Sequence, residues 1–200
     1  MTDERGRPRN FDIDLALDRA VEVFWKHGFE GASMHALTEA TGLGKPSLYA
    51  AFGNKESLYL KALERYVNLL IERHARLLTD EPDGRYAVEA FLHSLAEMMT
   101  NPSLPGGCFI INGTADCGSA SIPVKVEIAL QKALQGSETM LRERLLRAQH
   151  DGQLSLNVNH EDIAALFASL IAGLAVQAKS GASEAKLHLV IRAAMAVWPQ

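Results

Sequence analysis

The sequence predicts an all-α protein with an N-terminal three-helix helix-turn-helix domain and a larger helical regulatory and dimerisation domain. Apolar residues recur at three- and four-residue spacing through most of the chain. Clusters of Gly, Pro, Asn and Ser interrupt this pattern at short intervals, as expected for connections between helices. No strand pattern extends beyond short runs such as 108–111. We place the domain boundary after residue 53, which gives domains 1–53 and 54–200.

The predicted helices follow from these interruptions. The first covers residues 12–27, with one apolar face that includes Phe24, and Gly28 ends it. A long helix over 54–78 carries apolar residues on two faces, so it should contact two partners and link the domains. Further helices are predicted at 84–100, 107–118, 122–150, 160–179 and 183–198.

Residues 33–52 read as two short helices joined by a tight turn. Ser33 can cap the first helix, and Gly42 follows where the chain needs positive φ. Pro46 suits the first turn of the second helix, where its missing N–H costs nothing. A short exposed helix with basic, hydroxyl and small side chains fits the DNA major groove. The outward residues of this second helix are Lys45, Ser47, Tyr49, Ala50 and Ala51.

Residues 7–65 resemble the N-terminal DNA-binding domain of the TetR family of bacterial regulators. The most specific part of the resemblance is the string TGLGKPSLYAAFGNKESL, together with the aromatic residues around Gly28. Two departures are Gly44, where the family usually has a small hydroxyl residue, and the small residues at 50 and 51. The DNA-binding residues implied by the pattern and the resemblance are Arg7, Ser33, His35, Lys45, Pro46, Ser47, Tyr49, Ala50 and Lys55.

Several of these assignments have plain alternatives. Residues 2–10 form a polar arm in which Arg5, Arg7 and Arg9 alternate with Gly6 and Pro8, and it can follow DNA phosphates or form a solvated tail. His35 can be an exposed histidine without a role. Tyr49 can stack in the core, where its hydroxyl would need a partner. The position of the arm just before the helix-turn-helix favours DNA contact.

The charge balance restricts how DNA can be bound. The chain has a net charge of −4, and residues 1–65 carry 9 Lys and Arg against 10 Asp and Glu. This speaks against charge-driven, non-specific binding but allows a few well-placed phosphate contacts. The 48% hydrophobic content argues against disorder. With no expected membrane span, no signal peptide and two cysteines, we expect a soluble cytoplasmic protein.

The last two predicted helices suggest a homodimer. Residues 163–178 are apolar around nearly the whole helix, and 185–198 carry an apolar stripe. A second copy would complete a four-helix bundle and align two heads on a palindromic operator. An intramolecular core is the alternative. The predicted interface residues are Phe167, Leu170, Leu174, Leu187, Ile191 and Trp198.

An effector pocket is expected among the helices 54–78, 84–100, 107–118 and 122–150. Its aromatic and Met residues can equally be ordinary core. The resemblance implies a ligand-responsive regulator, most often a repressor, with an unknown small-molecule effector. The candidate pocket residues are Phe91, Leu95, Met98, Met99, Phe109 and Asn112.

Cys108 follows Pro-Gly-Gly, so it can occupy the first turn of a helix, where exposed N–H groups favour a thiolate. The string GCFIINGTADCG resembles a segment in TetR-like proteins that respond to electrophiles or oxidants through a cysteine. A small buried hydrophobe is the alternative. A bridge to Cys117 is not expected, since nine helical residues span about 13 Å.

We expect no metal, no cofactor and no enzymatic activity. Glu89 and His93 are four residues apart, but no second pair is visible and a surface contact is the simpler reading. The chain has no HExxH, P-loop or GxSxG motif. Two functional classes therefore remain: a repressor released by a small molecule, and a thiol sensor acting through Cys108. An architectural DNA binder is disfavoured by the acidic balance.

Overall fold

A computed structural model of the chain describes residues 12–198, which contain no strand. The predicted all-α fold is confirmed. Arg7 lies outside the described residues. The helices are α1 (Ile13–Gly31), α2 (Met34–Thr41), α3 (Lys45–Phe52), α4 (Lys55–Tyr66), the π-helix η1 (Val67–Ile71), α5 (Glu72–Asp80), α6 (Gly84–Thr100), α7 (Phe109–Thr114), α8 (Val124–His150), α9 (His160–Lys179) and α10 (Glu184–Met195).

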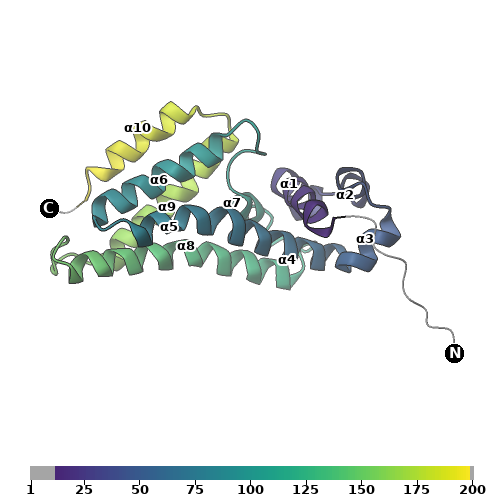
Figure 1. Ribbon diagram of the computed structural model, residues 1–200, viewed down its shortest axis with the longest axis horizontal. Helices are drawn as coiled ribbons and strands as arrows, with labels where there is room; N and C mark the ends of the chain where they lie inside the picture. Colours follow the sequence, from purple (N-terminus) through teal and green to yellow (C-terminus); the bar gives the residue numbers. More distant parts are fainter. Residues whose placement is uncertain (1–11, 199–200) are drawn as a thin grey trace.

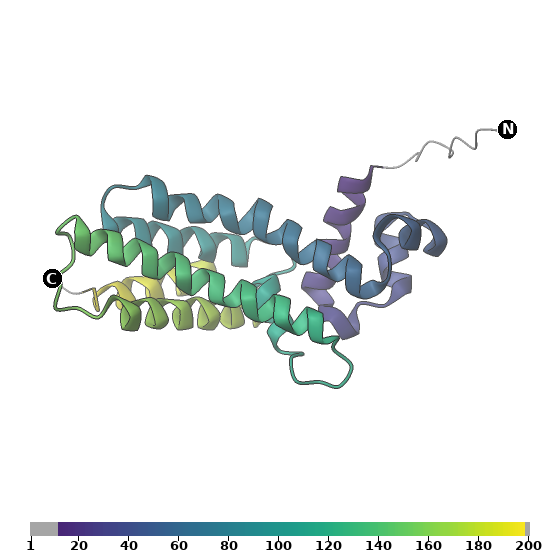
Figure 2. The ribbon, with the colours of Figure 1, turned by 90° about the horizontal axis from the view of Figure 1, so that it is seen from below.

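The molecule is elongated, with α1, α2 and α3 grouped at one end and α5 to α10 forming a bundle at the other (Figure 1). Helix α4 packs on α1 and then runs into the bundle. Helix α8 extends along the bundle from the head end to the far end (Figure 2). We call α1–α3 the head and α5–α10 the bundle.

The head is held to α4 by apolar packing and by one charged cluster. Phe24 and Trp25 on α1 are buried, and Phe24 meets Tyr59 of α4 edge-on, with ring centroids 4.9 Å apart. On the outside, the Arg65 guanidinium of α4 donates to Asp18 at 2.9 Å and to Asp14 at 3.1 Å. Because both acidic groups lie on α1, the cluster fixes α4 against the first helix.

The linking helix differs in detail from the single helix predicted over 54–78. Helical backbone continues from α4 through η1 into α5, and it reaches Asp80. The five residues of η1 form a π-helical turn, a local widening that is frequent at functional sites. Apolar spacing does not reveal such a turn, because one extra residue shifts the side chains without breaking the helix.

Two predicted helices are shorter in the structure. Helix α7 covers only Phe109–Thr114 of the predicted 107–118. Gly107, with φ 66°, precedes it, and residues 115–118 form turns in which Gly118 has φ 89°. Both values lie in the left-handed region, which ends or precludes an α-helix. Helix α10 ends at Met195, three residues before the predicted end.

Helix α9 contradicts the expectation that no segment is apolar enough to cross a membrane. By length and composition, His160–Lys179 passes such a test. In the fold it packs against α8 and α6, with Phe167 and Leu174 fully buried. Its apolar character therefore reflects a core helix with one further apolar face, which remains on the surface of the subunit.

Gly28 gives α1 its shape at the junction with the bundle. Its backbone has φ 69° and ψ −174°, and a short helical segment resumes after it up to Gly31. A Cβ built on Gly28 would lie 2.5 Å from the Asp116 Oδ2 atom. The backbone conformation requires glycine, and the Asp116 carboxylate occupies the space beside it.

We predict that Gly28→Ala lowers the free energy of unfolding by about 2 kcal/mol, because this backbone region is essentially restricted to glycine. Gly181→Ala is the matched control: Gly181 also has positive φ, 88°, but no atom lies within 4 Å of a built Cβ. Urea denaturation of both variants measures the difference. Equal losses would show that the Asp116 contact contributes nothing.

Candidate DNA-binding surface and effector cavity

Helices α2 and α3 are joined by the turn that the sequence predicts. The Ser33 hydroxyl accepts a hydrogen bond from the Ala36 N–H at 3.0 Å and so caps α2. Gly42 ends α2 with φ 69°, and its N–H donates to the Glu39 carbonyl. These local contacts fix the angle at which α3 leaves the turn.

Helix α3 presents a polar face because its apolar residues point inward. Leu48 and Phe52 are buried in the head, whereas the Tyr49 side chain is 39% exposed. The Lys45 ammonium lies 5.8 Å from the centre of the Tyr49 ring, so the two form one surface feature. The exposed residues at the start and centre of α3 are Lys45, Pro46, Ser47, Tyr49 and Ala50.

The start of α3 has no side-chain cap. Gly44 occupies the N-cap position and offers no side chain to the first N–H groups. His35 is exposed on the neighbouring α2, as is Ser33 at its N-cap. The head therefore carries donors and one aromatic ring around the uncapped start of a short helix, an arrangement that can contact phosphates and base edges.

Lys55 has a partner within the protein. Its ammonium donates to the Glu30 carbonyl at 3.4 Å and lies 4.7 Å from the centre of the Phe29 ring. Burial lowers the pKa of Lys55, and the Glu30 carboxylate opposes that shift. The Ser119 hydroxyl donates to the Glu30 carboxylate at 2.6 Å. Lys55 therefore joins the end of α1 to α4 in this structure.

The head and the bundle meet at the end of α1. The Trp25 indole N–H donates to the Gly106 carbonyl at 3.1 Å. The Asn112 amide donates to the Trp25 and Gly106 carbonyls, both at 3.3 Å. Lys179 of α9 adds a contact to the Lys26 carbonyl at 3.4 Å. These hydrogen bonds link α7 and α9 to the end of α1.

A cavity of about 500 Å³ lies within the bundle, beside this junction. Three of the predicted pocket residues line it: Phe91, Leu95 and Met99. The rest of the wall comes from residues of α4, η1 and α8 that we did not predict from the sequence. The second apolar face of the predicted 54–78 helix indicates those on α4. They include Leu60, Leu63, Val67, Ile71, Ala133 and Met140.

Three predicted pocket residues, Met98, Phe109 and Asn112, do not line the cavity. Phe109 is fully buried between Tyr59 and Tyr66, with ring centroids 5.3 and 5.4 Å away. Asn112 turns toward the junction, as described above. A helix as short as α7 has a face toward each neighbour, and its sequence does not show which face meets the cavity.

Cys108 lines the cavity, but its environment differs from the predicted one. It precedes α7 as the N-cap residue and is buried. Burial raises the pKa of the Cys108 thiol, while the Tyr66 hydroxyl, which donates to the sulfur at 3.4 Å, favours the thiolate. The N–H groups of Ile110 and Ile111 at the start of α7 also lower the pKa, but burial is the larger effect and the pKa of the thiol is raised overall. Cys108 and Cys117 are both free thiols.

Five of the predicted interface residues belong to the core of the subunit. Phe167, Leu174, Leu187 and Ile191 are fully buried, and Trp198 is nearly so. Only Leu170 is partly accessible. On a helix that is apolar all round, periodicity does not separate the core stripe from the outer stripe. The large apolar side chains that remain exposed on this side are Leu166, Val176, Leu189 and Val197.

Glu89 and His93 do not converge on a common site. Glu89 pairs with Arg85 at 3.1 Å, whereas the His93 ring contacts the His188 ring of α10. Within residues 12–198, no group of three or more His, Cys, Asp or Glu side chains is placed to hold a metal ion.

Family models match both parts of this architecture. The model described as "Bacterial regulatory proteins, tetR family" matches residues 16–62, and "Tetracyclin repressor-like, C-terminal domain" matches residues 84–194. The chain belongs to the TetR family. The resemblance seen in the sequence of the head is thereby confirmed and extends to the bundle.

Individual relatives agree with this TetR-family assignment. The HTH-type transcriptional repressor ComR of Escherichia coli K12 is 34% identical over 197 residues, which cover 98% of this chain and 93% of ComR. A cysteine mutant of the TetR family regulator CifR, complexed with 26 bp double-strand operator DNA, has a TM-score of 0.93. It is 38% identical, and the match covers 97% of this chain and all of that one.

A more distant structure shows the shared fold alone. Reduced NemR of E. coli has a TM-score of 0.75 at 21% identity, and the match covers 91% of this chain and 94% of that one. The TetR-family fold therefore persists at low identity, which is consistent with apolar spacing rather than particular residues maintaining the bundle.

We predict that Lys45→Ala weakens DNA binding at all salt concentrations and reduces the slope of log affinity against log salt by about one unit, because one phosphate contact is lost. Lys186→Ala, an exposed lysine on α10, is the matched control and should leave both quantities unchanged. Fluorescence anisotropy with labelled operator DNA measures them. An unchanged slope for Lys45→Ala would contradict the phosphate contact.

Proposed function

We propose that this TetR-family protein is a homodimeric transcriptional repressor that a small-molecule effector releases from a palindromic operator in the cytoplasm. One observation carries the proposal: the helix that supports the head also forms a wall of the cavity. Leu60 and Leu63 of α4 line the cavity, and Arg65 of the same helix holds Asp18 of α1. ComR, similar over almost its whole length, is named as a repressor.

The coupling between cavity and head follows from this shared helix. A ligand that fills the cavity presses on α4 and η1, and the α1–α4 cluster transmits the displacement to α3. Energetically the effector shifts a population, so it has to bind the DNA-incompetent arrangement more tightly than the DNA-bound one. The free energy available for release equals that difference in affinity, typically about 1–3 kcal/mol.

DNA contacts in this proposal come from both helices of the motif. Lys45 and Tyr49 contact phosphates, Ala50 approaches a base edge, and Ser33 and His35 flank them from α2. The backbone N–H groups in the first turn of α3, which no side chain caps, add donors for a phosphate. Arg7 would extend the contact along the duplex. Lys55, already bonded to α1, sets the position of α4 in the head.

The second copy would cover the outer stripe of α9 and α10. Leu166, Leu170, Gly173 and Val176 share one face of α9 at helical spacing, and Gly173 permits close approach of another helix. Leu189 extends this apolar surface onto α10. Packing two such pairs gives a four-helix bundle with two-fold symmetry, which matches a palindrome with half-sites about 34 Å or more apart.

We predict that Val176→Arg or Leu189→Arg converts the dimer into monomers and abolishes the footprint on the DNA upstream of the protein's own gene. The wild type should protect two symmetric half-sites there. Leu156→Arg is the control, since Leu156 is 81% exposed and lies in the 151–159 connection. Analytical ultracentrifugation and DNase footprinting measure both effects. A monomeric wild type with full operator selectivity would contradict the proposal.

A thiol sensor acting through Cys108 is the second candidate, because the sulfur lines the cavity. Its raised pKa lowers the fraction of thiolate, so the proposed reaction requires an electrophile that is first held in the cavity. This predicts selective rather than general reactivity.

We predict that Cys108→Ser removes operator release by a small apolar aldehyde or enone while leaving operator affinity intact. Cys117→Ser is the matched control, because Cys117 does not line the cavity. Mass spectrometry should find the adduct on Cys108 alone, and gel shift measures release. Unchanged release by Cys108→Ser would leave reversible ligand binding as the mechanism.

A further inference from the structure

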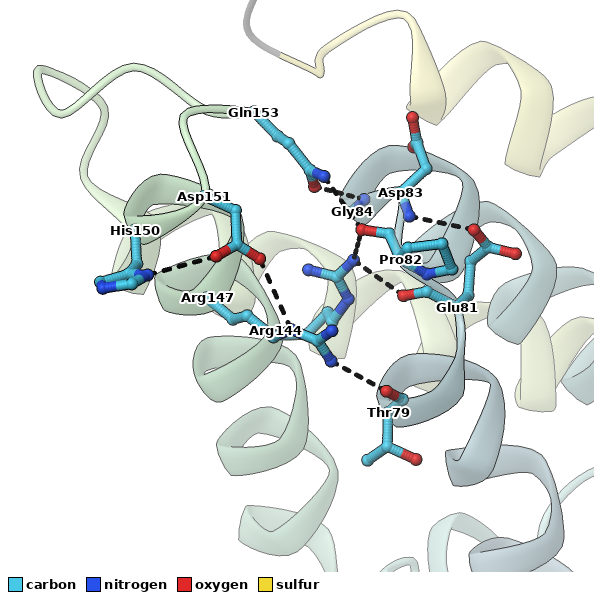
Figure 3. A network of polar contacts seen from close by, with 10 residues as sticks. All are labelled: Thr79, Glu81, Pro82, Asp83, Gly84, Arg144, Arg147, His150, Asp151 and Gln153. Atoms are coloured by element: carbon cyan, nitrogen blue, oxygen red, sulfur yellow. Dashed lines mark hydrogen bonds and ion pairs between the residues drawn. The ribbon is translucent and has the colours of Figure 1, made fainter.

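A second, smaller pocket of about 180 Å³ lies between α5 and α8, toward the far end of the bundle from the head. Two arginines of α8 line it, one turn apart, together with the last turn of α5. The lining residues are Ala75, Leu78, Thr79, Met140, Glu143, Arg144 and Arg147. Figure 3 shows the two guanidinium groups beside the connection from α5 to α6.

Arg144 is a buried cation with unused donors. Only 3% of the residue is exposed, and its Nη2 atom donates to the Glu81 and Pro82 carbonyls at 3.2 and 3.1 Å. Within the part of the chain that the structure describes, its Nε and Nη1 atoms have no hydrogen-bond partner. Burial lowers the pKa of Arg144, and repulsion from Arg147 adds to this. The guanidinium nonetheless stays protonated at neutral pH.

Arg147 strengthens the positive charge of the pocket. Its Nη1 atom donates to the Thr79 carbonyl at 2.8 Å, and its Nε atom lies 3.6 Å from the Asp151 carboxylate (Figure 3). The two arginines thus cap the last carbonyls of α5 and the turn that follows. Capping accounts for the hydrogen bonds of Nη2 of Arg144 but leaves Nε and Nη1 without acceptors. Buried donors without acceptors lower the stability of a fold. Glu143 lines the pocket from an exposed position.

The small pocket continues the line of the large cavity. Met140 lines both spaces. On α8, Ser137 of the cavity and Arg144 of the pocket are seven residues apart, about 10 Å along the helix. On α5, Glu72 lines the cavity and Ala75 the pocket. Met140 is thus part of the wall between the two spaces, and methionine is a flexible side chain.

We propose that the effector is an amphipathic carboxylate, whose apolar chain fills the large cavity and whose carboxylate binds Arg144 and Arg147 past Met140. This inference depends on the proposed ligand-responsive function. The mostly apolar wall of the cavity accepts a hydrocarbon chain. The small pocket is lined by the two arginines, so a carboxylate placed there meets two guanidinium groups. Guanidinium groups bind carboxylates with charge-assisted, often bidentate hydrogen bonds.

Paired ligands test the role of the charge. Decanoic acid and decanol differ only in their head group, and calorimetry measures their affinities for the full-length dimer at neutral pH. Wild type should bind the acid at least tenfold more tightly than the alcohol. Arg147→Gln should remove most of this preference and leave affinity for the alcohol unchanged. Arg144→Lys should do the same, since it keeps a cation but loses the guanidinium geometry.

Lys132→Gln is the matched control, because Lys132 is an exposed cation that lines the large cavity. It should retain the preference for the acid. Equal affinity of wild type for acid and alcohol would overturn the inference, and so would a preference that Arg147→Gln retains or that Lys132→Gln removes. These outcomes hold even if Arg144→Lys fails to fold.

Operator release, measured separately by anisotropy, distinguishes this inference from the proposed function. Release by decanol as effective as release by the acid would leave the proposed function standing and overturn the carboxylate assignment. Arginine-dependent binding of the acid without operator release would support the carboxylate site and count against the proposed release mechanism.

Discussion

The helical segment from Lys55 to Asp80 packs against the head at one end and forms part of the bundle at the other. This double packing constrains the rest of the structure. Its first turns pack on α1, where Arg65 bonds Asp18 and Asp14. Its middle, η1, lines the cavity, and its last turn is capped by arginines of α8. The same helical segment therefore contacts α1, the cavity and α8.

The π-helical turn lies where that segment meets the cavity. Val67, Asn68 and Ile71 are both part of η1 and part of the cavity wall. A π turn keeps the helix continuous, but its hydrogen bonds run from residue i to i+5 and so interrupt the regular α-helical pattern on either side. In the response to a small molecule that we propose, this turn is the place where the relation between α4 and α5 would change.

Among the residues that the structure describes, charged side chains are exposed or partly exposed, with Arg144 as the one buried exception. The head lacks an excess of basic residues, which disfavours DNA binding driven by general charge attraction. Inside the bundle, Arg144 is a buried cation that donates hydrogen bonds to backbone carbonyls rather than to a carboxylate.

The sequence by itself determined the helical class, the turn from α2 to α3 and the exposed face of α3, because Ser33, Gly42 and Pro46 act through local backbone chemistry. Tertiary structure decided which apolar stripes face inward: Phe167, Leu174 and Ile191 pack in the core, although the sequence placed them at a dimer interface. It also placed the Asn112 amide at the junction between head and bundle, and it placed Met140 and Arg144 in the wall of the same small pocket. Periodicity shows that a face is apolar, whereas only the packed neighbours show what covers it.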